Sequence, residues 1–179
     1  MDNGKISVRY ARTLLQYANE QHCETEVYEG LTRLTNSIGK ALNQFNEVLS
    51  NPLVGDDKKY ELLLTAIGDP VHPCLNEFLK FLTEKKRENK IFTIALKYQE
   101  MYRLEKNLLK ANVTTAMELE ETTLENIKQF METNFHCKAE MHVKVNPSLI
   151  GGFILDIEND RFDASIKGRL KSVKEMRNN

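Results

Sequence analysis

The chain has 179 residues, of which 41% are hydrophobic and 28% charged, a composition typical of a soluble folded protein. The formal net charge of −1 gives no general electrostatic attraction for nucleic acid. None of the apolar runs reaches the roughly 18 residues that a membrane-spanning helix needs. The N-terminal residues lack the successive basic, apolar and small-residue regions of a secretory signal, so we expect a protein kept in the cytosol or bound to something that faces it.

The first ~105 residues carry apolar side chains at helical spacing. A helix is expected to stop before Pro52, because a residue that precedes proline is pushed out of the helical region. Pro73 suits the first turn of another helix. The predicted helices cover residues 6–21, 27–45, 48–50, 56–67, 73–82 and 91–102. Short connections between successive amphipathic helices predict a six-helix antiparallel bundle over residues 1–107.

After residue 107 the apolar spacing changes from a helical period to alternation. Glu140, His142 and Lys144 are expected on the wet face of one strand. The predicted elements are strands at 110–116, 139–145, 153–157 and 161–163 and helices at 124–131 and 166–176. Asn159 and Asp160 form a turn signal between the last two strands, which are expected to pair as a hairpin. Residues 108–179 therefore predict a small α/β domain with a short mixed sheet and two helices, which would be marginally stable alone.

Histidine and cysteine occur together at three places, and each could suggest chemistry. A metal site or a Cys–His nucleophile would have to gather these residues from different elements, because no chelating pair of the usual spacing is present. The three cysteines include no C-x-x-C pair, so a disulfide framework is not expected. We expect structural or surface side chains here, and neither catalytic residues, nor a metal, nor a cofactor. The three places are His22-Cys23, His72/Cys74 and His136-Cys137.

Two short motifs near the C-terminus invite functional interpretations that their context disfavours. Gly151 and Gly152 lead into the strand that begins at Phe153, whereas a phosphate loop leads into a helix N-terminus. A turn or bulge that needs bare backbone is the better interpretation. Asp163 and Ser165 stand directly before a predicted helix, where they serve as caps for unpaired N–H groups rather than as half of a catalytic set.

The segment 146–170, NPSLIGGFILDIENDRFDASIKGRL, resembles the C-terminal signature of the delta subunit family of rotary ATP synthases. The positions that carry this resemblance are Asn146, Leu149, Gly151, Gly152, Phe153, Asp163, Ser165, Arg169 and Leu170. The opening helix SVRYARTLLQYA and the stretch 78–102 are also similar to family segments, so the resemblance covers nearly the whole chain in order. Departures at Thr13, Glu118 and Ala164 affect only local packing. Mitochondrial members of this family are known as the oligomycin-sensitivity-conferring protein.

The resemblance implies a non-catalytic stator subunit, monomeric within a hetero-oligomeric complex, at the cytoplasmic face of the bacterial inner membrane without inserting into it. The N-terminal bundle would bind the N-terminal helix of an alpha subunit in the catalytic head. The C-terminal domain would bind the b-type peripheral stalk, so that ion-driven rotation is coupled to ATP synthesis. The resemblance implies that the alpha helix contacts Tyr10, Thr13, Leu14, Tyr17, Phe78, Phe81 and Leu82.

Helical geometry adds two observations on these candidates. The apolar arc of the first helix is about 220° wide, whereas a surface helix needs little more than about 100°. This width also fits a helix placed centrally in the bundle. In the fifth helix Phe81 points away from the stripe of Leu75, Phe78 and Leu79, and an aromatic that the core does not bury is a candidate anchor for a partner.

Two other classes of function remain open at this point. An RNA-associated helical interaction module with an α/β appendage would use the basic residues at 85–87 and along the last helix, which otherwise form solvated faces or a dock for an acidic partner. Such a module predicts a strongly basic domain with interleaved aromatics, and the sequence has neither. A small transferase or hydrolase predicts a clustered acid, base or nucleophile, which the sequence also lacks.

Overall fold

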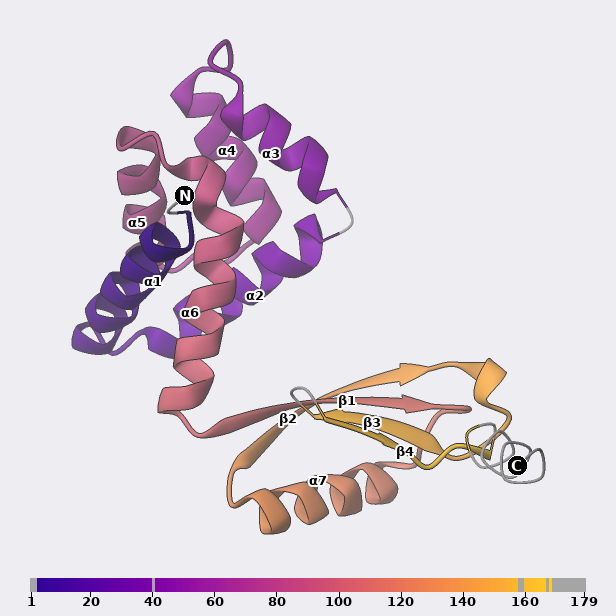
Figure 1. Ribbon diagram of the computed structural model, residues 1–179. Helices are drawn as coiled ribbons and strands as arrows, with labels where there is room; N and C mark the ends of the chain where they lie inside the picture. The colour runs from indigo at the N-terminus through magenta and orange to yellow at the C-terminus, as the bar shows by residue number, and fades with distance from the viewer. Residues whose placement is uncertain (1–2, 40, 158–159, 167, 169–179) are drawn as a thin grey trace. The chain divides into compact units, whose positions relative to one another are not determined.

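The computed structural model describes residues 3–39, 41–157, 160–166 and 168, and the chain divides into two compact units, Met1–Leu104 and Glu105–Asn179 (Figure 1). The described part of the first unit is helical, and that of the second contains a four-stranded mixed sheet and a helix. The chain is therefore an α+β protein. Within the described residues no helix has both the length and the apolar character needed to cross a membrane.

Helices α1 to α6 build the first unit. Their bounds are α1 Asn3–Glu20, α2 Glu24–Ile38, α3 Leu42–Ser50, α4 Asp56–Ile67, α5 Pro73–Glu84 and α6 Ile91–Glu105, with a 3-10 turn η1 at Glu88–Lys90. Helix α2 packs against α4 and α5, and α1 packs against α2 and α5. The fully buried core includes Leu31 of α2, Leu63 of α4, Leu75 of α5 and Ile94 of α6. Burial of these aliphatic side chains is what holds the helices together.

Close packing and polar ties fix how the helices of this unit meet. A Cβ added to Gly30 would lie 2.6 Å from Leu75 Cδ2, so the missing side chain lets α2 approach α5 closely. Arg33 donates from Nε to the Ile67 carbonyl at 3.0 Å, and this satisfies an orphan carbonyl at the end of α4. The buried Lys59 of α4 pairs at 2.8 Å with the buried Glu88 of η1.

The structure confirms several predicted helix ends and corrects one. Helix α3 ends at Ser50 before the Asn51-Pro52 pair, and α5 starts at Pro73, as predicted. The predicted continuous helix over 27–45 is wrong, because α2 ends at Ile38 and Phe45 belongs to α3. A tight turn in which the Ala41 N–H donates to the Ile38 carbonyl at 2.7 Å breaks the helix there.

The second unit is a mixed sheet with α7 along one face (Figure 1). Its elements are β1 Leu108–Thr115, α7 Glu121–Phe135, β2 Lys138–Val145, a 3-10 turn η2 at Pro147–Leu149, β3 Phe153–Ile157 and β4 Asp160–Asp163. The strand order is β2-β1-β3-β4, with β1 parallel to β2 and antiparallel to β3. Its core consists of Ala111, Val113, Met131, Leu155 and Ile157.

The predicted alternation along β2 is only partly right. His142 and Lys144 are exposed, as expected, but Glu140 is half-buried. Val143 and Val145 are also exposed, although they were expected to face the core. Strand β2 lies at the edge of the sheet with β1 as its neighbour, so its side chains have cover from one side only.

The C-terminal signature plays a structural role where the structure describes it. Strands β3 and β4 pair as the predicted hairpin, whereas its turn at 158–159 lies outside the described residues. The Ser165 N–H and Oγ–H both donate to Asp163 Oδ1, at 2.9 and 2.6 Å, and Ser165 Oγ accepts from the Gly168 N–H at 3.0 Å. These hydrogen bonds from Ser165 lower the pKa of Asp163, and the pattern is that of the predicted cap.

The two glycines of the signature differ in how closely they are packed, and only Gly152 meets fixed backbone. Gly152 has a φ of 75°, and a Cβ there would collide with the Ala164 carbonyl oxygen. At Gly151 an added Cβ would lie 2.6 Å from the end of the Ile166 side chain. Arg169, Leu170 and most of the predicted last helix lie outside the described residues.

Candidate docking groove between α1 and α5

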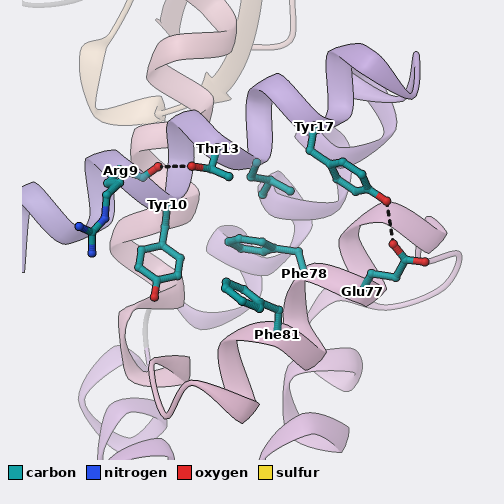
Figure 2. Close-up of a pocket in the computed structure, with 8 residues that line it drawn as sticks. Arg9, Tyr10, Thr13, Tyr17, Glu77, Phe78 and Phe81 are labelled. Carbon is teal, nitrogen blue, oxygen red and sulfur yellow. Dashed lines mark hydrogen bonds between the residues drawn. The ribbon is translucent and has the colours of Figure 1, made fainter.

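A cavity of about 400 Å³ lies between α1 and α5 (Figure 2). It is lined by Arg9, Tyr10, Thr13, Leu14 and Tyr17 from α1 and by Glu77, Phe78 and Phe81 from α5. The cavity is open to solvent along one side of the first unit, so it is a surface groove. Its middle is aromatic and aliphatic, and Figure 2 shows the rings of Tyr10, Phe78 and Phe81 gathered between the two helices.

The wide apolar arc of α1 explains its side of the groove. The core of the unit takes the small and aliphatic part of the arc, in particular Ala11, Leu15 and Ala18. The core leaves Tyr10 half-buried and Tyr17 exposed, and both rings line the groove. Helix α1 therefore presents two apolar faces, one to the core of the first unit and one to the groove.

Helix α5 divides its aromatic residues in the same way. Leu75, Leu79 and Leu82 are fully buried in the core of the first unit. Phe78 is buried at the edge of the groove, and Phe81 is 43% exposed, which confirms that it lies off the core stripe. The ring of Phe81 lies 6.1 Å from that of Tyr10 with a tilt of 38°, a favourable arrangement for an aromatic pair.

Charged and polar side chains stand at the ends of the aromatic stretch. The Arg9 guanidinium lies 5.9 Å from the centre of the Tyr10 ring, and Lys85 Nζ lies 5.7 Å from that of Phe81. Tyr17 lies about 12 Å along α1 from Arg9, a little over two helical turns. Its hydroxyl donates a hydrogen bond to Glu77 Oε2 at 2.7 Å. This hydrogen bond, followed by desolvation and the Glu77 charge, raises the pKa of Tyr17 to about 12.

Six of the seven residues expected to meet a partner helix line this one groove. They are Tyr10, Thr13, Leu14, Tyr17, Phe78 and Phe81. Leu82 is fully buried and does not line it. Contact with a partner stays a prediction for all of them.

Two lining residues, Arg9 and Glu77, were not predicted from the sequence, because the candidates were chosen among apolar positions. A signal for both was present. Arg9 precedes Thr13 by four residues and Glu77 precedes Phe81 by four, so each lies on the same helix face as a candidate.

A second apolar cavity, of about 560 Å³, lies in the second unit between α7 and strands β3 and β4. Exposed aromatic side chains at its border are Phe130 and Phe135 from α7 and Phe162 from β4. Large exposed aromatics around one cavity are typical of an interaction surface. This cavity was not predicted, because Phe130 fits the helical stripe of α7 and Phe162 fits a strand.

The structure also brings together residues from two of the three histidine–cysteine places. Cys23 Sγ lies 2.8 Å from Cys74 Sγ, and His72 offers a ring nitrogen within 4.8 Å of both sulfur atoms. Cys137, in the second unit, is half-buried, and all three cysteines are free thiols.

Comparison with known proteins decides the family. The model of the family described as "ATP synthase delta (OSCP) subunit" matches residues 6–176. The chain belongs to the ATP synthase delta (OSCP) family. It is therefore a non-catalytic stator component of the rotary ATP synthase, part of the peripheral stalk and peripheral to the membrane. The RNA-associated module and the small enzyme are not supported.

Relatives of the family cover almost the whole chain. The ATP synthase subunit delta of Bacteroides fragilis is 35% identical over 179 residues, which are 98% of this chain and 95% of the relative. That of Phocaeicola vulgatus is 32% identical over 97% of this chain and 94% of the relative. A chain in the cryo-EM structure of the Toxoplasma gondii mitochondrial ATP synthase hexamer matches with a TM-score of 0.65 at 20% identity, over 95% of this chain and 96% of that one. This last similarity establishes a shared fold.

Proposed function

We propose that this delta-family chain ties the catalytic head to the b-type stalk through two separate surfaces. Residues 1–107, acting as one six-helix antiparallel bundle, hold the amphipathic N-terminal helix of an alpha subunit in the α1–α5 groove. Residues 108–179 hold the C-terminal end of the b-type stalk protein. The chain acts as a monomer in the complex, at the cytoplasmic face of the bacterial inner membrane, and stops the head from turning with the rotor.

The observation that carries this proposal is the exposed aromatic lining of the groove. An amphipathic helix presents apolar side chains every three or four residues, and it binds by laying them into such a groove. Phe81 is the strongest candidate anchor, because it is a large aromatic that the bundle leaves exposed beside Tyr10 and Phe78. A buried apolar contact dissociates slowly, which suits a joint that bears torque.

The charges at the groove ends favour one orientation of the bound helix. A helix carries a partial positive charge at its N-terminus and a partial negative charge at its C-terminus. We infer that the alpha helix lies with its N-terminus toward Glu77 and its C-terminus toward Arg9 and Lys85. A spin label at one end of an alpha peptide would then broaden the NMR signals near Glu77 or near Arg9, according to which end carries it.

The decisive experiment is the substitution Phe81→Asp, with affinity for a peptide of the alpha N-terminal helix measured by isothermal titration calorimetry. A charge in the middle of the groove is expected to weaken binding by about 30-fold or more, as for a binding hot spot. Leu96→Asp is the matched control, since Leu96 of α6 is 44% exposed against 43% for Phe81 and does not line the groove. Equal affinity of the Phe81→Asp and unaltered chains, with both folded by circular dichroism, would refute the assignment of the groove.

A further inference from the structure

Two cysteines from distant parts of the chain meet inside the first unit. Cys23 lies in the corner between α1 and α2, and Cys74 lies in the first turn of α5, 51 residues later. Both are buried, with 2% and 6% of their surface exposed. Their sulfur atoms lie 2.8 Å apart, less than about 1 Å beyond the roughly 2.05 Å of a disulfide bond.

We propose that Cys23 and Cys74 form an oxidisable dithiol, which a small hydroperoxide converts to a disulfide that joins the α1–α2 corner to the start of α5. Neither cysteine lines the docking groove. Cys23 lies three residues after the end of α1 and Cys74 lies in α5, so the bond would join the corner that follows one groove helix to the start of the other. The relevance of the bond to partner binding rests on the proposed function, whereas the chemistry of the site does not.

The two thiols differ in burial and in their place in the hydrogen bond that joins them. Cys23 Sγ–H donates to Cys74 Sγ. Burial in the first place, and then this hydrogen bond, raises the pKa of Cys23 to about 12, so Cys23 keeps its proton at neutral pH. Cys74 is the more exposed of the two and its sulfur is the acceptor. In the proposed reaction Cys74, the more exposed sulfur, meets the oxidant first, and Cys23 resolves the product.

The reaction balances with one hydroperoxide per pair. Cys74 sulfur attacks the O–O bond of hydrogen peroxide and loses its proton, which yields a sulfenic acid and one water. Cys23 sulfur then attacks the sulfenic sulfur, and the expelled hydroxide takes the Cys23 proton and leaves as a second water. Two electrons pass from the two sulfurs to the peroxide, and a dithiol reductant such as dithiothreitol reverses the change.

The Cys23–Cys74 disulfide would change both the unfolded ensemble and the folded state. Joining residues that are 51 positions apart removes loop-closure entropy from the unfolded ensemble and so stabilises the first unit. In the folded state it fixes the distance between the α1–α2 corner and α5. If the spacing of the groove helices is fixed in this way, the chain loses less conformational entropy when a helix binds.

The test treats the full-length chain with hydrogen peroxide, blocks remaining thiols with an alkylating reagent and maps the peptides by mass spectrometry. We expect a linked pair of peptides containing Cys23 and Cys74, a mass loss of about 2 Da, and a rise in Tm of about 10 °C that dithiothreitol reverses. Cys23→Ser and Cys74→Ser should each abolish the Tm rise. Cys137→Ser, the control in the second unit, should retain it.

Two outcomes would overturn the dithiol. One is that Cys23 and Cys74 stay alkylatable at a peroxide dose that oxidises Cys137. The other is that the chain binds one equivalent of Zn²⁺ through Cys23, His72 and Cys74 and resists oxidation until a chelator removes it. Affinity of the reduced chain for the alpha peptide separates the test of the proposed function from the test of the disulfide. A reduced chain that does not bind the peptide contradicts the proposed function, and the disulfide result still stands.

Discussion

The hydroxyl of Tyr17 donates a hydrogen bond to the Glu77 carboxylate at 2.7 Å, and this bond ties α1 to α5 at one end of the docking groove. Tyr17 and Glu77 are 60 residues apart in the chain, and both line the groove that the aromatic rings fill (Figure 2). The bond thus sets the distance between two helices at the place where a partner helix is proposed to enter. It also gives the groove a spectroscopic reporter, because it shifts the ionisation of a tyrosine.

Removing the carboxylate with Glu77→Ala should lower the pKa of Tyr17 from about 12 toward its ordinary value of 10.0, since the hydrogen bond is the main cause of the shift. A raised tyrosine pKa means that the folded state favours the neutral phenol. The contribution of this bond to stability is therefore fully present below pH 10 and is lost as the pH rises toward 12. Carbon-13 NMR of the tyrosine Cζ atoms follows the titration, with Tyr17→Phe to assign the signal. A Tyr17 titration that is the same with and without Glu77 would contradict this account.

Breaking the buried ion pair should destabilise the first unit strongly. Lys59→Met leaves the Glu88 carboxylate buried without its cation, at a cost of about 3–5 kcal/mol. The double variant Lys59→Met/Glu88→Leu removes both charges and should recover most of that loss. Urea unfolding of Lys59→Met, of Glu88→Leu and of the double variant measures the free energies of unfolding for a double-mutant cycle. A single substitution that costs under about 1 kcal/mol would show that the pair is solvated in solution.

The adjacent glycines of the signature should differ in their tolerance of a methyl group. Gly152→Ala adds a side chain at a φ of 75° and against the Ala164 carbonyl, and should cost the second unit about 2–4 kcal/mol. Gly151→Ala meets only the far end of the Ile166 side chain, which can move, and should cost about 1 kcal/mol or less. Amide hydrogen exchange in β3 reports on both. Equal protection in the two variants would rule out the steric explanation.

Phe162→Ala should weaken binding of a C-terminal fragment of the b-type stalk protein to the full chain by about tenfold, if the apolar cavity of the second unit holds the stalk. Met117→Ala is the control, because Met117 is also exposed in this unit and does not line the cavity. Surface-immobilised binding measurements give both affinities. Equal losses in the two variants would place the stalk elsewhere on the unit.

Helix ends that depend on local chemistry could be predicted from the sequence. Pro73 and the Asn51-Pro52 pair constrain the backbone within a residue or two, and the structure places ends there. The break after Ile38 was missed, because apolar residues continue at helical spacing through Ala41 to Phe45, although Gly39 directly after Ile38 is a signal for a helix end. Both helices bury the same side of the chain in one core, so the pattern carries across the break.

The groove and the cysteine pair also differ in whether local sequence could predict them. That Phe81 is left out of the core follows from its angle on a single helix, so the sequence was sufficient. The meeting of Cys23 and Cys74 depends on how the α1–α2 corner packs beside α5, and no local pattern carries that information. Val143 was misplaced for a related reason, since edge strands differ from central ones only in the pairing of the whole sheet.

The position of β1 in its sheet has a consequence for how the chain matures on the ribosome. Strand β1 pairs with β2 on one side and with β3 on the other, and β3 ends at Ile157. The second unit therefore cannot complete its sheet until nearly the whole chain has been synthesised. The two helices that line the groove end at Glu84, so the groove proposed to bind the head can form while the sheet is still being translated.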